Sequence, residues 1–422
     1  MRRWITGVLA TAIVVAGAPL QAQAAPGDPA PAWPLQRSDG AWSVAVAQSG
    51  RVFTLAHPAP DVPGSISLNT SYNGTWPTPT QLPEVGGVVR AGFGPYGIVV
   101  SWSEWNDGSH LVSREFINGQ WTEPERIGEF LNTTSLDTNT DGDAVIVWRS
   151  PDGFMAGVHP RGGSWSTLPV TVAPQNAPLS AAINESGKVA LVWSEGTNGT
   201  SRTVRRSVLR PGATTWTSPQ TLGTISSHDG SPRIVTDGHG RETIVAGGKL
   251  WRQRTTNSTP AYAFTVGQYA EIAAGTDDTR VIWPYENGRY LSVRTRQFRE
   301  RDATESWGPT TTAWAKSFPA TVPAECRQQV NTGLGITPGG RSYVALGVVA
   351  DAGSTLCANN KARLVTLDRK STPLNDVAVG GYFNGSGFGV AVNARGPVAV
   401  DYQGDGADNG WGDTNSLKFF TR

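Results

Sequence analysis

The chain has 422 residues, with 35 Lys and Arg against 34 Asp and Glu, so its formal net charge is +1. This balance excludes binding that depends on a strongly basic chain, and no nucleic-acid partner is expected. The 50 Gly, 29 Pro and 16 Trp favour many short strands joined by tight turns.

Residues 1–25 have the features of a secretion signal peptide. Arg2 and Arg3 give a charged end, residues 4–20 are largely apolar, and Ala22-Gln23-Ala24 is a small-x-small cleavage site. We therefore expect Sec export, a propeller domain of residues 26–422, and a secreted, extracellular protein. No later segment is apolar enough to span a bilayer, so no membrane span is expected.

The stretch Leu179–Gly223 is the clearest copy of a repeated unit. After a short inner segment and a turn comes Lys188–Ser194, whose continuous apolar character is typical of a strand buried on both faces. Arg202–Leu209 mixes apolar residues with Arg, which indicates a strand nearer to solvent, and Trp216–Leu222 contains Pro219, which favours a sheet edge. Four strands in this order predict one blade of a β-propeller.

The buried strand recurs eight times along the chain. Its copies are Arg51–Ala56, Gly97–Ser103, Asp143–Arg149, Lys188–Ser194, Arg241–Gly247, Thr279–Pro284, Arg341–Val348 and Pro397–Gln403. Trp residues near the end of this strand recur in register at Trp102, Trp148, Trp193 and Trp283, and we expect them to pack between blades. The sequence therefore predicts an all-β fold, a single closed propeller of eight four-stranded blades. Seven blades is the alternative, because the fifth and seventh copies are the weakest.

A Trp- and Pro-containing edge segment, Ala32–Leu35, precedes the first buried strand, whereas the last repeat has three recognisable strands before the chain stops. We expect an edge strand near residues 32–37 to complete the C-terminal blade and close the ring. Cys326 and Cys357 are the only two cysteines, and one disulfide between them fits an oxidising compartment.

Propeller ligands usually bind on the face that carries the loops between the second and third strands. Here these loops are rich in carboxylates, amides and aromatic rings, a mixture that suits sugar hydroxyls and apolar sugar faces. The candidate ligand-binding residues are Trp105, Asn106, Asp107, Tyr285, Asn287, Asp405, Asp408 and Trp411. The alternative is that the Asx-Gly pairs in these loops serve only the tight turns.

One segment has oxygen ligands at alternate positions, as calcium loops do. Asp137, Asn139 and Asp141 precede Gly142 and resemble the start of the calcium loop of integrin-type propeller repeats. The later acidic ligand of that pattern is missing, because Val145 and an apolar strand take its place. Calcium is the one cofactor considered, and a turn without a metal is the alternative.

The edge segments Gly74-Thr75-Trp76 and Gly119-Gln120-Trp121 resemble those of secreted sialidase-like (BNR-type) propellers, and the resemblance extends over most of the mature chain. The Asp boxes of those families, Ser-x-Asp-x-Gly-x-x-Trp, are absent here. Their arginine triad and nucleophilic Tyr cannot be placed on particular positions either. The resemblance therefore implies the architecture and not the activity.

Three functions fit this sequence. The first is a non-catalytic binding propeller for a glycan or an extracellular protein partner, through the loop face. The second is a glycoside hydrolase or polysaccharide lyase, which needs converging carboxyl groups; the candidates are Glu104, Asp152, Glu195 and Glu286. The third is a scaffold that uses its flank, where arginines concentrate on the third strands of the fourth to sixth copies, although those arginines also suit a solvated outer strand.

Overall fold

The structure is a computed structural model. It describes residues 41–46, 52–56, 66–71, 80–82, 90–93, 98–104, 110–117, 120–196, 200–226, 231–287, 290–300, 306–317, 332–337, 339–348, 361–368, 373–380, 388–392, 398–405 and 413–419. The signal peptide, the edge segment near 32–37 and both cysteines lie outside these residues. Within them, no helix has the length and hydropathy needed to cross a membrane.

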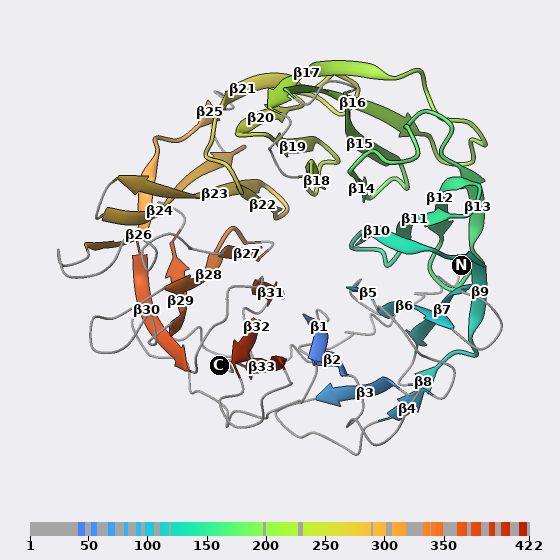
Figure 1. Cartoon of the computed structure of the whole chain (residues 1–422), viewed down its shortest axis with the longest axis horizontal. Helices are drawn as coiled ribbons and strands as arrows, with labels where there is room; N and C mark the ends of the chain where they lie inside the picture. The colour runs from blue at the N-terminus through green and yellow to red at the C-terminus, as the bar shows by residue number, and fades with distance from the viewer. Residues whose placement is uncertain are drawn as a thin grey trace, which may run out of the picture.

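The described strands form small antiparallel sheets in which chain neighbours pair, and Figure 1 shows these sheets following one another around a circle. The first two sheets are β1(Ala41–Val46), β2(Val52–Ala56), β3(Ile66–Ser71), β4(Thr80–Leu82) and β5(Arg90–Phe93), β6(Ile98–Glu104), β7(His110–Ile117), β8(Gln120–Trp121), with β9(Glu125–Glu129) also paired to β7. The third is β10(Asn132–Thr138), β11(Ala144–Ser150), β12(Gly153–His159), β13(Ser166–Pro169). The fourth is β14(Leu179–Ile183), β15(Val189–Glu195), β16(Ser201–Leu209), β17(Gln220–Ser226).

The later sheets repeat the same order. The fifth is β18(Arg233–Thr236), β19(Glu242–Ala246), β20(Lys249–Arg252), β21(Ala261–Thr265). The sixth is β22(Glu271–Ala274), β23(Asp278–Asn287), β24(Tyr290–Arg299), β25(Ser306–Trp307), with β26(Thr311–Ser317) also paired to β24. The seventh is β27(Thr332–Ile336), β28(Ser342–Val348), β29(Lys361–Leu367), β30(Pro373–Gly380), and the last has three described strands, β31(Phe388–Val392), β32(Val398–Asp405), β33(Asp413–Phe419).

The second strand of each sheet coincides with one of the eight predicted buried segments, which confirms the repeat. In β15, every side chain from Val189 to Trp193 is fully buried, because the preceding and following sheets pack on the two faces of this strand. The core lies between neighbouring sheets: Val145 and Val147 of β11 share a cluster with Leu191 and Trp193 of β15. The predicted packing role of the Trp residues at this position is confirmed for Trp148, Trp193 and Trp283, which are all buried.

The turn between the first two strands is built by an Asx side chain and a Gly. Asn184 Oδ1 accepts hydrogen bonds from the backbone amides of Ser186 and Lys188, at 3.0 and 2.9 Å. Gly187 has φ of +74°, a conformation that favours glycine. Asp237 and Gly240 build the sister turn of the next sheet in the same way.

One expected boundary is wrong. The edge strand of the fourth sheet begins at Gln220 and not at Trp216. Trp216 is instead buried in the core beside Leu209, because this large ring contributes more by filling the space between sheets than by joining a ladder. Pro219, which has no amide hydrogen, directly precedes the strand.

Candidate functional site

The loops between second and third strands gather at one end of the sheets, which we call the loop face, and several predicted residues there lie outside the described part of the chain. These are Trp105, Asn106, Asp107, Asp408 and Trp411. Glu104 is the last residue of β6 and Asp405 the last of β32, so both are at this end of their sheets. Their roles stay predictions.

Glu195, at the end of β15, has its carboxylate occupied by neighbouring side chains. Trp193 Nε1 donates to its Oε2 at 2.9 Å, and Arg205 Nε makes an ion pair with its Oε1. Asp152 lies exposed in the turn between β11 and β12, in a different sheet. Glu195 is thus engaged by residues of its own sheet, and no contact among the described residues joins it to Asp152.

Tyr285, Glu286 and Asn287 lie at the loop-face end of β23. The guanidinium carbon of Arg294 on β24 lies 3.2 Å from the centroid of the Tyr285 ring, so a cation–π contact covers one face of that ring. Glu286 and Asn287 are exposed beside it. These two polar side chains are therefore accessible to a ligand.

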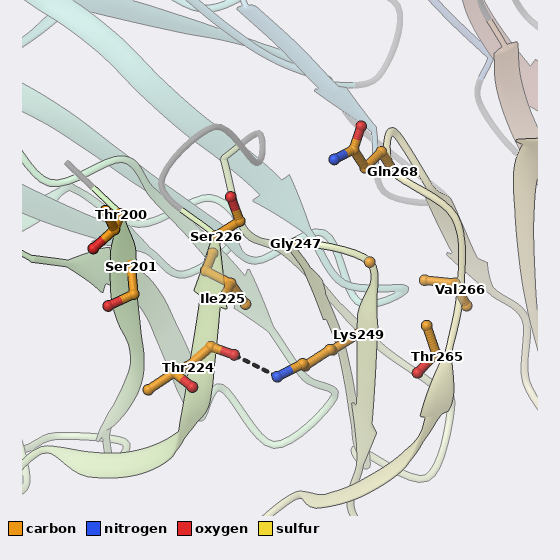
Figure 2. Close-up of a pocket in the computed structure, with 11 residues that line it drawn as sticks. Thr200, Ser201, Thr224, Ile225, Ser226, Gly247, Lys249, Thr265, Val266 and Gln268 are labelled. Carbon is orange, nitrogen blue, oxygen red and sulfur yellow. Dashed lines mark hydrogen bonds between the residues drawn. The ribbon is translucent and has the colours of Figure 1, made fainter.

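A pocket of about 460 Å³ opens on the loop face between the fourth and fifth sheets, and Figure 2 shows its lining. It is formed by Thr200, Ser201, Thr224, Ile225, Ser226, Gly247, Gly248, Lys249, Thr265, Val266 and Gln268. The Lys249 side chain extends across the pocket, and its Nζ donates to the backbone carbonyl oxygen of Thr224 at 2.6 Å. Five hydroxyl groups, one amide and one ammonium therefore border a space of ligand size.

Sequence reasoning missed this pocket, although a signal was present. Gly247 and Gly248 form the two-residue turn between β19 and β20, with φ of +52° and +71°. The pocket is lined mainly by Ser and Thr, whereas the residues predicted for the loop face are carboxylates, amides and aromatic rings.

The predicted calcium residues are engaged in the turn between β10 and β11. Asn139 Oδ1 accepts from the Asp143 amide at 2.9 Å, and its Nδ2 donates to the Asn184 carbonyl at 3.1 Å. Asp137 Oδ2 accepts from the Ile183 amide at 2.9 Å, whereas Asp141 is exposed. Desolvation raises the pKa of Asp137 to about 6, although backbone hydrogen bonds oppose the shift. Calcium binding here stays a prediction.

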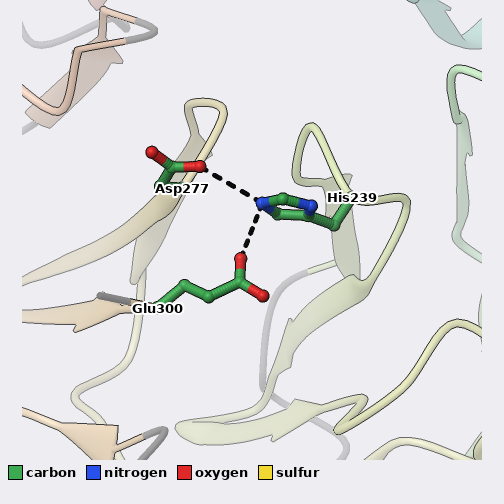
Figure 3. Close-up of side chains that lie close together, drawn as sticks. All are labelled: His239, Asp277 and Glu300. Carbon is green, nitrogen blue, oxygen red and sulfur yellow. Dashed lines mark hydrogen bonds and ion pairs between the residues drawn. The ribbon is translucent and has the colours of Figure 1, made fainter. Parts of the chain in front are cut away.

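A second group of side chains lies at the opposite end of the sheets and was not predicted. His239, Asp277 and Glu300 offer ligand atoms that all lie within 4.8 Å of one another (Figure 3). His239 is in the turn before β19, Asp277 in the sister turn before β23, and Glu300 follows β24. Along the chain these residues are far apart, so spacing alone does not reveal them. The sister turns of adjacent repeats were the available signal.

Five of the arginines on the third strands are engaged by neighbouring side chains. Arg205 is paired with Glu195, Arg206 with Glu242 and Arg252 with Asp237. Arg294 and Arg296 lie over the rings of Tyr285 and Phe264, respectively. These contacts weaken the case for a polyanion on the flank.

No protein-family model and no curated protein matches the chain. Among solved structures, the WD40 domain of SCAP from fission yeast is similar with a TM-score of 0.52 and 7% identity, over 92% of this chain and 93% of that chain. The β-propeller domain of the Trilobed protease from Pyrococcus furiosus has a TM-score of 0.45 and 12% identity, over 80% of this chain and 98% of that chain. The polysaccharide lyase Uly1 has a TM-score of 0.41 and 9% identity, over 83% of this chain and 93% of that chain.

The likeness to the WD40 domain concerns the fold alone. Together with the consecutive four-stranded antiparallel sheets, it shows that the chain has a β-propeller fold. Propellers serve binding and catalysis alike, so the function has to be argued from the sites of this chain.

Proposed function

We propose that this protein is an exported, non-catalytic propeller that binds a glycan through its loop face. The observation that carries the proposal is the hydroxyl-lined pocket between the fourth and fifth sheets. Glycans present many hydroxyl groups, each of which can donate and accept, and Ser, Thr, Gln and Lys side chains complement both roles. Export rests on the signal-like character of residues 1–25.

We further propose that the propeller is a closed ring of eight blades. Each inner strand contacts the next in the cycle β1, β5, β10, β14, β18, β22, β27, β31, and β31 contacts β1. In this ring, the edge segment near 32–37 would be the fourth strand of the last sheet, beside β31, β32 and β33. Pairing the two ends of the chain in one blade would tie down both termini.

A glycan array with the purified protein tests the binding function. Thr224 is exposed on the outer strand at the pocket, so we expect Thr224→Trp to fill the pocket and abolish binding of the best glycan. Thr215 is an exposed residue at the opposite end of the same sheet, and Thr215→Trp is the matched control that should bind normally. Absence of any glycan ligand on a broad array would overturn the proposal. Pull-down from culture supernatant would then test a protein partner.

The same array locates the ligand within the loop face. Trp105→Ala and Trp411→Ala remove the aromatic side chains predicted for the loops. Loss of binding in these variants as well as in Thr224→Trp would extend the site from the pocket across the loops. Release of free sugar from any hit, lost in Glu104→Gln or Glu286→Gln, would instead establish the hydrolase or lyase function.

A further inference from the structure

Three side chains from two neighbouring sheets converge on one point at the end of the molecule opposite the loop face. His239 Nε2 lies 3.2 Å from Asp277 Oδ1 and 2.7 Å from Glu300 Oε2. Figure 3 shows both carboxylates directed at the same ring nitrogen. The histidine belongs to the fifth sheet and the two carboxylates to the sixth, so this cluster bridges two sheets.

Backbone hydrogen bonds hold the three residues in place. Asp237 Oδ1 accepts from the amides of His239 and Arg241, at 3.0 and 2.9 Å, which fixes the turn that carries the histidine. The amide of Glu300 donates to the carbonyl of Asp277 at 3.2 Å, so the two carboxylate residues are tied to each other. Such preorganisation lowers the entropy cost of collecting ligands around an ion.

The turns of the two sheets are also in direct contact. The amide of Gly238 lies 3.2 Å from the carbonyl oxygens of both Gly275 and Thr276. A Cβ atom on Gly238 would lie 2.8 Å from the Cα of Thr276, so only glycine permits this approach. The spacing between His239 and Asp277 is therefore set by packed backbone and not by flexible side chains alone.

The charges at this point favour a cation. One imidazole nitrogen carries at most one proton, yet it faces oxygens of two carboxylates. In the neutral form with the lone pair on Nε2, three electron-rich atoms face one another, and a divalent cation is the partner that all three can share. Arg241 Nη2 lies 2.6 Å from Glu300 Oε2 and 3.0 Å from Asp237 Oδ2. Arg252 Nη2 also pairs with Asp237 Oδ2. Three carboxylates and two guanidinium groups thus lie around the histidine.

We propose that His239, Asp277 and Glu300 bind a divalent transition-metal ion of the Zn²⁺ type. One imidazole nitrogen and two carboxylate oxygens are a donor set that such ions accept, whereas Ca²⁺ prefers oxygen ligands alone. The side chains are 46%, 41% and 30% exposed, respectively, so the remaining coordination positions open to solvent. Arg241 Nη1 keeps its 2.9 Å contact with Glu300 Oε1 and orients that carboxylate.

The bound ion would crosslink the fifth and sixth sheets. It would stabilise the folded chain, because a ligand that binds only the native state raises the free energy of unfolding. This site is at the opposite end of the sheets from the glycan pocket, since the turn at His239 and the turn at Gly247 terminate β19 at its two ends. The metal proposal is therefore independent of the glycan proposal.

The test uses the full mature protein, stripped with EDTA and then titrated calorimetrically with Zn²⁺. We expect one ion per chain and a rise in Tm with Zn²⁺, and we expect Co²⁺ to give visible d–d bands. His239→Ala should weaken Zn²⁺ binding by more than about 100-fold, because loss of a direct ligand exceeds the usual effect of an outer partner. Asp277→Asn and Glu300→Gln keep the side-chain shapes and should weaken binding as well. Asp152→Asn, an exposed carboxylate on the loop face, is the control and should bind Zn²⁺ like the wild type.

Two results would overturn the proposal. One is the absence of heat, Tm shift and cobalt bands at millimolar metal. The other is unchanged Zn²⁺ affinity in His239→Ala, measured on protein whose metal-free Tm shows that it is folded. If His239→Ala lowers the Tm equally with and without Zn²⁺, the cluster is an ion-pair contact between sheets and not a metal site.

Discussion

The indole of Trp251 on β20 is docked against Leu222 on the outer strand of the preceding sheet. Its Nε1 donates to the Leu222 carbonyl oxygen at 3.0 Å, and its ring covers Gly223. Trp148, two sheets earlier, makes the same kind of contact. Its Nε1 donates to the backbone carbonyl oxygen of Glu129 at 2.8 Å, and its ring lies over Gly128. A Trp–Gly contact of this kind therefore joins neighbouring blades at two places.

Gly223→Val should destabilise the protein by about 1–3 kcal/mol, because a Cβ at this position would lie 3.3 Å from Trp251 Cζ2 and a branched side chain has no space. Equilibrium unfolding in urea measures the change. Gly308→Ala is the control, since the nearest atom to its Cβ would be the Gln297 oxygen at 3.4 Å. Equal loss of stability in both variants would contradict the docking role of Gly223.

Glu242 is a fully buried carboxylate that contacts two cations. It pairs with Arg206 of the fourth sheet and lies 3.3 Å from Lys188 Nζ. Glu242→Gln leaves the buried Arg206 without a counter-charge, so we expect a loss of about 3–5 kcal/mol in the free energy of unfolding. Arg233→Gln alters a pair in which Arg233 is 55% exposed and should cost about 1 kcal/mol or less. Similar losses in the two variants would refute this ranking.

Asp137 predicts a specific pH dependence of stability. Its pKa is about 6 in the fold, where desolvation is the main cause, against the ordinary value of 3.8. Since the folded state holds this proton more tightly, the contribution of Asp137 to stability is fully present below pH 3.8. It is lost as the pH rises through about 6, by up to about 3 kcal/mol. Asp137→Asn cannot ionise, so its advantage over the wild type should grow across this window. Urea unfolding of both proteins at several pH values, in EDTA, measures the free energy of unfolding. Parallel pH curves for the wild type and Asp137→Asn would contradict the prediction.

The sequence predicted the blades well because each blade depends on local signals. An Asx-Gly turn followed by a continuous apolar run identifies β15 without any long-range information. The sites were harder to predict, because they depend on which strand ends meet in space. His239 and Asp277 are 38 residues apart and meet only because the turns of adjacent sheets pack together. The pocket likewise joins Thr224 and Lys249 through the gap between two sheets.

The candidate carboxylates can be separated by their surroundings. Both carboxylate oxygens of Glu195 are engaged by Arg205 and Trp193, so this side chain is poorly placed to act on a substrate. We expect Glu195→Gln to lower the free energy of unfolding by roughly 1 kcal/mol through the lost ion pair, and to leave glycan binding unchanged. Glu286 is exposed, and Glu286→Gln should change stability by less than about 0.5 kcal/mol. Urea unfolding and the glycan array measure both effects. A variant of Glu195 that keeps its stability but loses turnover of a polysaccharide would assign this residue to catalysis instead of structure.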